Sequence, residues 1–293
     1  MNHKRIAVFG TAGIVTLSTL CHSFSCFAAT EAEYVKDENV YVRMGNDGDV
    51  LGTYVVNGFI VLDEGEITDY GDYESVKNLT NLDEIEKDKD EYTIYAEKGK
   101  FYYQGDIKNA ELPWSFDVEY ELDGKAIDPE DLAGESGDLE LTIKVKKNDD
   151  MNVGDFFDNY MLQTAVTLDN DLCEDIEAEG ATMVDTGSSE KLTFTFMPGR
   201  EKPAEDDGAV ASYVVKASVE DFEMDDITIN GAPMMPVEMS FASADNANTR
   251  QTMFIMSVEG IEIPEEETVE AEQVENKGNF IQQIIDRFKN RNI

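Results

Sequence analysis

The chain has 293 residues, among them 63 Asp and Glu and 23 Lys and Arg, which gives a net charge of −40 at pH 7. A body this acidic repels phosphates on nearly every face, which excludes nucleic acids as partners. The two histidines, His3 and His22, lie in the first 28 residues. Removal of that segment therefore also excludes catalytic triads, Cys–His pairs and histidine zinc sites, and no cofactor is expected.

Residues 1–28 have the organisation of a secretory signal peptide. A positively charged start is followed by an uncharged apolar stretch at 6–20, and Cys26 and Ala28 supply small residues at positions −3 and −1. Cleavage after Ala28 predicts a secreted, extracellular protein that associates with the cell surface. An uncleaved anchor stays open, because the apolar run is nearly long enough to span a bilayer.

Cys173 is the only cysteine outside the signal segment, so an intramolecular disulfide is excluded and stability must come from hydrophobic cores. Acidic neighbours surround this thiol, including Asp171, Glu174 and Asp175. Such neighbours raise the pKa of a thiol, whereas a reactive cysteine needs basic ones. The sequence predicts a buried, inert thiol at this position.

Residues 29–109 predict an N-terminal β-rich module. It opens with two β-rich runs, 39–44 and 50–62, joined by the turn-forming residues 45–49, which is the pattern of a hairpin. The remainder consists of a turn-rich stretch at 67–82, a charged stretch at 84–91, and a second pair of strands at 92–95 and 100–104 around Glu97-Lys98-Gly99.

Residues 110–263 predict an immunoglobulin-like β-sandwich. Residues 114–122 and 139–146 alternate between apolar and polar side chains, the period of a strand with one buried face. A turn at 123–125 and a single helical turn at 129–132 lie between them. Further short strands are predicted at 162–168, 182–184, 192–196, 213–219 and 227–229. Short strands at this spacing, with Gly and Pro turns, are typical of a sandwich.

The C-terminal part changes in character. Residues 264–278 predict an acidic linker, and residues 279–293 a short, basic amphipathic helix that begins at Asn279. A helix this short is marginal alone in water, so it needs a surface: the protein's own body, an anionic membrane or an envelope protein. The residues predicted to bind a membrane or a partner are Phe280, Ile281, Ile284, Ile285, Arg287, Phe288, Lys289 and Arg291.

Two other functions stay open on the acidic residues. Acidic loops at 46–49, 169–175 and 205–207 carry oxygen ligands suited to weak calcium binding, although none has the spacing of an EF-hand loop, and no metal ligand set is assigned. A carboxylate-dependent cell-wall glycoside hydrolase is the other alternative. Among 63 acidic residues, however, some pair at a suitable separation is inevitable and does not favour catalysis.

Several segments resemble a known family. They are Tyr102-Tyr103-Gln104-Gly105, Glu111-Leu112-Pro113-Trp114, Leu122-Asp123-Gly124-Lys125, Pro129 to Gly137, and Asp221-Phe222-Glu223-Met224-Asp225. Together they resemble the extracytoplasmic region of YhgE/Pip-like membrane proteins of Gram-positive, clostridia-type bacteria, over roughly residues 38–232. The resemblance implies a shared fold and no catalytic residue. The helical repeats and membrane helices of larger relatives are missing from this sequence.

Taken together, these patterns predict a secreted, non-enzymatic binding or adaptor protein on the surface of a Gram-positive bacterium. Its β modules form the body, and its C-terminal helix associates with the membrane or with an envelope partner.

Overall fold

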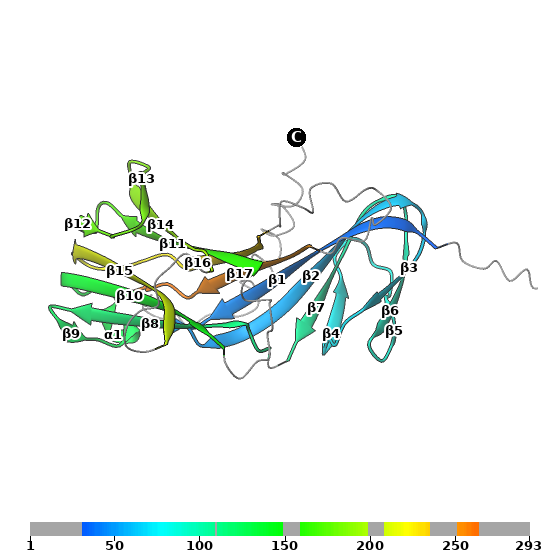
Figure 1. Cartoon of the computed structure of the whole chain (residues 1–293), viewed down its shortest axis with the longest axis horizontal. Coiled ribbons are helices and arrows are strands. Elements are labelled where there is room, and N and C mark those ends of the chain that lie inside the picture. Colours follow the sequence, from blue (N-terminus) through cyan, green and yellow to red (C-terminus); the bar gives the residue numbers. More distant parts are fainter. Residues whose placement is uncertain (1–30, 109, 149–158, 199–207, 235–250, 264–293) are drawn as a thin grey trace, which may run out of the picture.

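A computed structural model describes residues 31–108, 110–148, 159–198, 208–234 and 251–263, and most of these residues are in β-strands (Figure 1). The prediction of a mainly β protein is confirmed. Within these ranges, no helix is long and apolar enough to cross a membrane. The predicted signal peptide, acidic linker and C-terminal helix lie outside the described residues.

The largest sheet has nine strands in the order β13-β14-β11-β16-β17-β1-β2-β7-β4. All neighbours in it are antiparallel except β1 and β17, which run parallel with Val40 beside Phe254. Its strands are β1 (Glu33–Met44), β2 (Val50–Asp63), β4 (Ser75–Asn78), β7 (Gly99–Ile107), β11 (Tyr160–Asp169), β13 (Thr182–Asp185), β14 (Ser189–Phe196), β16 (Ile227–Pro233) and β17 (Gln251–Val258).

Two smaller sheets complete the fold. The five-stranded sheet has the order β12-β15-β10-β8-β9, and the three-stranded sheet has the order β3-β6-β5. Their strands, with one helical turn, are β3 (Gly65–Tyr70), β5 (Glu86–Asp88), β6 (Glu91–Ala96), β8 (Trp114–Leu122), β9 (Lys125–Ala126), α1 (Pro129–Leu132), β10 (Gly137–Lys147), β12 (Cys173–Glu177) and β15 (Ala209–Val219).

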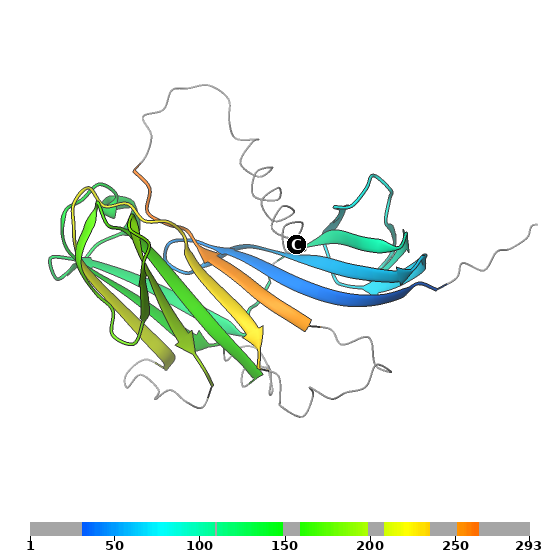
Figure 2. The ribbon, with the colours of Figure 1, turned by 90° about the horizontal axis from the view of Figure 1, so that it is seen from above.

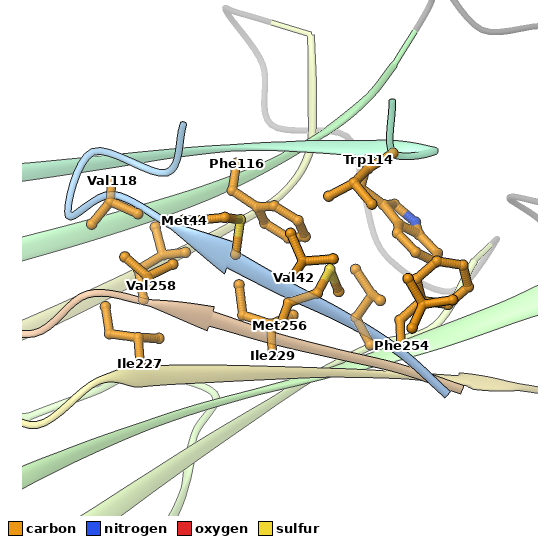
Figure 3. Close-up of a cluster of buried hydrophobic side chains, with 14 of the residues drawn as sticks. Val42, Met44, Trp114, Phe116, Val118, Ile227, Ile229, Phe254, Met256 and Val258 are labelled. Atoms are coloured by element: carbon orange, nitrogen blue, oxygen red, sulfur yellow. The ribbon is translucent and has the colours of Figure 1, made fainter. Parts of the chain in front are cut away.

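The five-stranded sheet packs face to face on one half of the nine-stranded sheet, which confirms the predicted β-sandwich. Figure 3 shows alternate residues of β8 meeting those of β1, β16 and β17 between the two sheets. The ring of Trp114 lies edge-on to two other rings. The distance between ring centroids is 5.2 Å to Phe254 and 5.8 Å to Tyr160. Edge-to-face packing of this kind adds to the stabilisation from apolar burial.

The three-stranded sheet packs on the same face of the nine-stranded sheet, at the other end of the long strands β1 and β2 (Figure 2). Its Ile67 and Tyr92 join Phe59 of β2 and Tyr103 of β7 in the interior. Both ends belong to one continuous cluster of buried apolar residues. The nine-stranded sheet thus contains strands from both sides of the predicted boundary at residue 109, and the division into two modules stays a prediction.

The regular alternation of apolar and polar residues in β8 and β10 predicts one buried face for each strand, and the structure has these faces. Leu139, Leu141, Ile143 and Val145 are buried, and the residues between them are not. The turn after β8 places Asp123 and Gly124 at positive φ, a conformation that glycine adopts without steric cost. The predicted helical turn is present as α1.

Three parts of the N-terminal region differ from the predictions. The stretch predicted as turn-rich contains β3 and β4, and the charged stretch contains β5. Strands β6 and β7 form as predicted but do not pair with each other, because β6 pairs with β3 and β5, while β7 pairs with β2 and β4. Their apolar faces meet across the interior instead, so residues 97–98 connect two sheets rather than closing a hairpin.

The central strand of the sandwich provides a test of the core. Leu141 is fully buried, whereas Leu82 is fully exposed at 101%. We expect Leu141→Ala to lower the free energy of unfolding by about 2 to 5 kcal/mol, because it removes buried methyl groups and leaves a cavity. The matched change Leu82→Ala is expected to have no measurable effect. Urea unfolding of both variants, followed by circular dichroism, measures the difference; equal stabilities would contradict this core.

Candidate functional site

The residues predicted to bind a membrane or partner all belong to the C-terminal segment at 279–293. They lie outside the described residues, so their role stays a prediction. An exposed apolar surface on the β body was not expected from the sequence, yet the structure contains one, and it is the candidate site. It lies on the outer face of the β1–β2 hairpin, which is the face opposite the core.

Three exposed apolar side chains form an outer strip on this hairpin: Val35, Ile60 and Leu62. Val35 and Ile60 are register partners on β1 and β2, and Leu62 follows two residues later on the same face. Their exposed fractions are 38%, 51% and 40%. Contiguous exposed apolar side chains on a folded surface mark interaction sites more often than scattered ones do.

The surroundings of the outer strip combine aromatic rings with negative charge. Further along the same face, the rings of Tyr41 and Tyr54 stack at 5.0 Å. Asp37 lies between this pair and the strip, two residues after Val35 on β1. Partial burial raises the pKa of the Asp37 carboxyl, and nearby Lys100 opposes that shift. The strip is thus suited to an apolar partner surface, and it is flanked by one negative charge, Asp37, and one positive charge, Lys100, which is the register partner of Ile60 on β7.

A buried polar cluster lies beneath the hairpin, where the nine-stranded and three-stranded sheets meet. The Nζ atom of Lys36 on β1 is 2.6 Å from both Oδ1 and Oδ2 of Asp69 on β3, and 3.7 Å from Oε2 of Glu38. The hydroxyl of Tyr103 on β7 donates to Asp69 Oδ2 at 2.6 Å. Burial raises the pKa of Tyr103, as does the Asp69 carboxylate, so the phenol is a hydrogen-bond donor at neutral pH. These four residues are the Lys36 cluster.

The acidic loops with calcium-type residues use their carboxylates for turn geometry. Asp47 Oδ1 accepts the backbone N–H of Asp49, and Asp169 Oδ1 accepts that of Asp171. In the described part of the chain, no group of three or more His, Cys, Asp or Glu side chains is arranged to hold a metal ion. The loop at 205–207 lies outside that part. The structure therefore adds no support for calcium binding.

An open, polar groove of about 930 Å³ lies beside the β11–β14 end of the sandwich. Four of its lining residues are acidic, namely Asp169, Glu223, Asp225 and Glu262. This lining repels anions, and the groove is open and more polar than the mostly apolar walls typical of a small-molecule site. We assign it no function.

Cys173 is buried at the start of β12, in agreement with the predicted inert thiol. Burial raises the pKa of Cys173 to about 11, and the Asp169 carboxylate adds to the effect. The nucleophilic thiolate is therefore scarce at neutral pH, which argues against a catalytic or redox role.

No known protein family matches the sequence, and no curated protein has significant sequence similarity to it. Among solved structures, the chain is similar to the mu homology domain of Fcho1 from Danio rerio with a bound Eps15 peptide, at 9% identity and a TM-score of 0.39, over 79% of this chain and 97% of that one. It is similar to the yeast delta-COP-I mu-homology domain, alone and with a Dsl1 WxWxV peptide, at TM-scores of 0.33 and 0.34, with the same identity and coverage. TM-scores below 0.5 describe only a loosely shared strand arrangement, so no function or site passes from these proteins to this chain.

The burial of Cys173 has a direct chemical readout. At pH 8, a thiol with a pKa of about 11 is ionised to roughly one part in a thousand, and its side chain is also shielded from reagents. We expect the native mature protein to react with a thiol reagent such as Ellman's reagent at least about 100-fold more slowly than the protein in concentrated urea. A Cys173→Ser protein that carries Val184→Cys, at a half-exposed position, is the reactive control. Equal rates for native and unfolded Cys173 would contradict its burial.

Proposed function

We propose that this protein is a secreted, non-enzymatic binding protein of the Gram-positive cell surface, similar in fold to the extracytoplasmic region of YhgE/Pip-like proteins. The signal-like segment at 1–28 supports secretion, and the absence of histidine from the rest of the sequence argues against the commonest hydrolase chemistries. The observation that carries the binding role is the outer strip, an exposed apolar surface on a strongly acidic protein.

The partner that fits the outer strip best is an envelope protein with an apolar, positively charged surface. Apolar contact supplies affinity, and complementary charge steers association and excludes anionic competitors. Because the chain has a net charge of −40, it attracts a positively charged partner and repels a negatively charged one. The membrane itself is an unfavourable partner for the strip, since anionic lipid headgroups repel an acidic β body.

The C-terminal segment supplies a separate means of attachment in this proposal. Its apolar residues, Phe280, Ile281, Ile284, Ile285 and Phe288, share one helical face, and Arg287, Lys289 and Arg291 add positive charge. Such a helix lies in the headgroup region of an anionic membrane with its apolar side buried. The acidic linker at 264–278 then holds the β body away from the surface, where the outer strip is accessible to its partner.

The outer strip can be tested by a single change. We expect Ile60→Asp to weaken binding of the mature protein to Gram-positive envelope preparations by about tenfold or more, because it places a charge within the apolar contact. Leu82→Asp adds the same charge at an isolated, fully exposed position and is the matched control. Binding is measured with labelled protein before and after proteolysis of the envelopes. Binding that survives proteolysis, or that both variants weaken equally, contradicts a protein partner at the strip.

The C-terminal segment can be tested with lipid vesicles. We expect mature protein to co-sediment with phosphatidylglycerol vesicles at low salt and to be released by added salt, since both apolar burial and charge contribute. Ile284→Glu, on the apolar face, is expected to abolish sedimentation, whereas Gln282→Glu adds the same charge on the polar face and retains most of it. If wild-type protein does not sediment, the segment is not a membrane anchor.

A further inference from the structure

The Lys36 cluster is unusual because its charges lie in the interior yet do not cancel. Lys36 contributes one cation, while Asp69 and Glu38 contribute two carboxylates, and the three side chains are 11%, 11% and 9% exposed. The ring of Phe59 lies 5.5 Å from the Lys36 nitrogen and forms an apolar wall. Desolvation makes such a group of charges costly, and replacing the ion pair by a neutral group removes most of that cost.

The close approach of the Lys36 nitrogen to the Asp69 carboxyl group also favours a chemical reaction between them. The two Asp69 oxygens are each 2.6 Å from the Lys36 nitrogen and thus hold this nitrogen close to Cγ, the carbon that joins them. Reacting atoms held this close in a fold have a very high effective concentration, which removes much of the entropic barrier to bond formation. Glu38 lies 3.7 Å from the Lys36 nitrogen as a proton acceptor, and Tyr103 donates a hydrogen bond to one of the Asp69 oxygens.

We propose that Lys36 and Asp69 condense to form an intramolecular amide bond. The Lys36 ammonium first gives a proton to the Asp69 carboxylate. The amine nitrogen then attacks Cγ, and the Nζ–Cγ bond forms. Tyr103 stabilises the negative charge that develops on Oδ2 through its hydrogen bond.

The second half of the reaction releases water. Glu38 accepts a proton from the attacking nitrogen and passes it to the Asp69 hydroxyl, which leaves as water when the Cγ–Oδ1 bond breaks. The amide keeps the third ammonium proton and Oδ2. An ammonium and a carboxylate thus become an amide and one water molecule, Glu38 is regenerated, and no other reactant is required.

The bond joins two sheets that no disulfide joins within the described residues, where Cys173 is the only cysteine. Lys36 belongs to the nine-stranded sheet and Asp69 to the three-stranded sheet, so the amide ties the two sheets together at their junction. Like any cross-link, it lowers the entropy of the unfolded chain and thereby stabilises the folded state. It resists reducing agents, which a disulfide does not.

Intact-mass spectrometry of the purified mature protein tests the proposal. We expect a mass lower than the sequence mass by one water molecule, and a peptide map in which the Lys36 peptide is linked to the Asp69 peptide. In Lys36→Arg the ion pair is kept but the condensation is blocked, so this variant is expected at its full sequence mass. Lys146→Arg, at a partly exposed pair with Asp117, is the matched control and is expected to keep the loss.

The remaining outcomes are equally decisive. We expect Glu38→Gln to accumulate protein of full sequence mass, because the proton acceptor is gone; a complete link in this variant would overturn the role of Glu38. Wild-type protein at its full sequence mass, folded by circular dichroism, would overturn the amide bond. A loss of water that persists in Lys36→Arg would do the same, because it must then arise elsewhere, such as at an Asp-Gly step.

Discussion

The parallel pairing of β1 with β17 is the constraint on which the rest of the structure depends. It places the first described strand in the middle of the nine-stranded sheet, between a hairpin partner, β2, and the last described strand. Parallel strands need a long connection, and here nearly the whole described chain lies between them. The sheet is therefore complete only when the first and last described strands are both in place, and the folding of these two strands is coupled.

The β1–β2 hairpin transmits this constraint to both smaller sheets. At one end, Val42 and Met44 pack under the five-stranded sheet (Figure 3), and at the other end Phe59 and Val61 pack under the three-stranded sheet. A strand of 14 residues such as β2 is longer than most. This length lets one hairpin serve two packing layers, while its opposite face stays available for binding.

How much of this follows from the sequence depends on the surroundings of each strand. Strands β8 and β10 each have one wet face, so their alternation reveals them directly. Strand β17 does not alternate between apolar and polar residues, because both of its faces are covered: Phe254 faces the core, while Ile255 packs beside Tyr41 on the other side. Its continuous apolar run therefore lacks the two-residue period that reveals a strand with one wet face. A parallel partner so distant in sequence leaves no local signal at all.

The Lys36 cluster explains why strand β3 was not predicted from the amino-acid composition of its segment. Its Asp69 belongs to a residue type that favours turns, but the carboxylate is held in a strand by Lys36 and Tyr103, both far away in the sequence. The actual pairing partners of β6 and β7 are missed for a related reason. Their connection looks like a hairpin turn, and only the burial of Tyr92 against Tyr103 shows that the strands lie in different layers.

The candidate binding surface was missed for a different reason, although its signal is present. Residues 50–62 are apolar at positions of both parities, which means that β2 cannot bury all of them against one core. The surplus, Ile60 and Leu62, forms the outer strip. The C-terminal segment is the opposite case. Its amphipathic pattern is clear in the sequence, but the sequence does not identify the surface to which it binds.

The position of the Lys36 cluster explains what the proposed cross-link would stabilise. The part of the chain that the structure describes contains one cysteine, Cys173, and therefore no disulfide to hold its layers together. The three-stranded sheet is small enough to depend on its neighbour. The junction between these sheets lies directly under the outer strip, because Val35 and Lys36 are consecutive residues on opposite faces of β1. A covalent bond at Lys36 therefore stiffens the hairpin where its other face is exposed, and a stiffer surface loses less entropy when it binds.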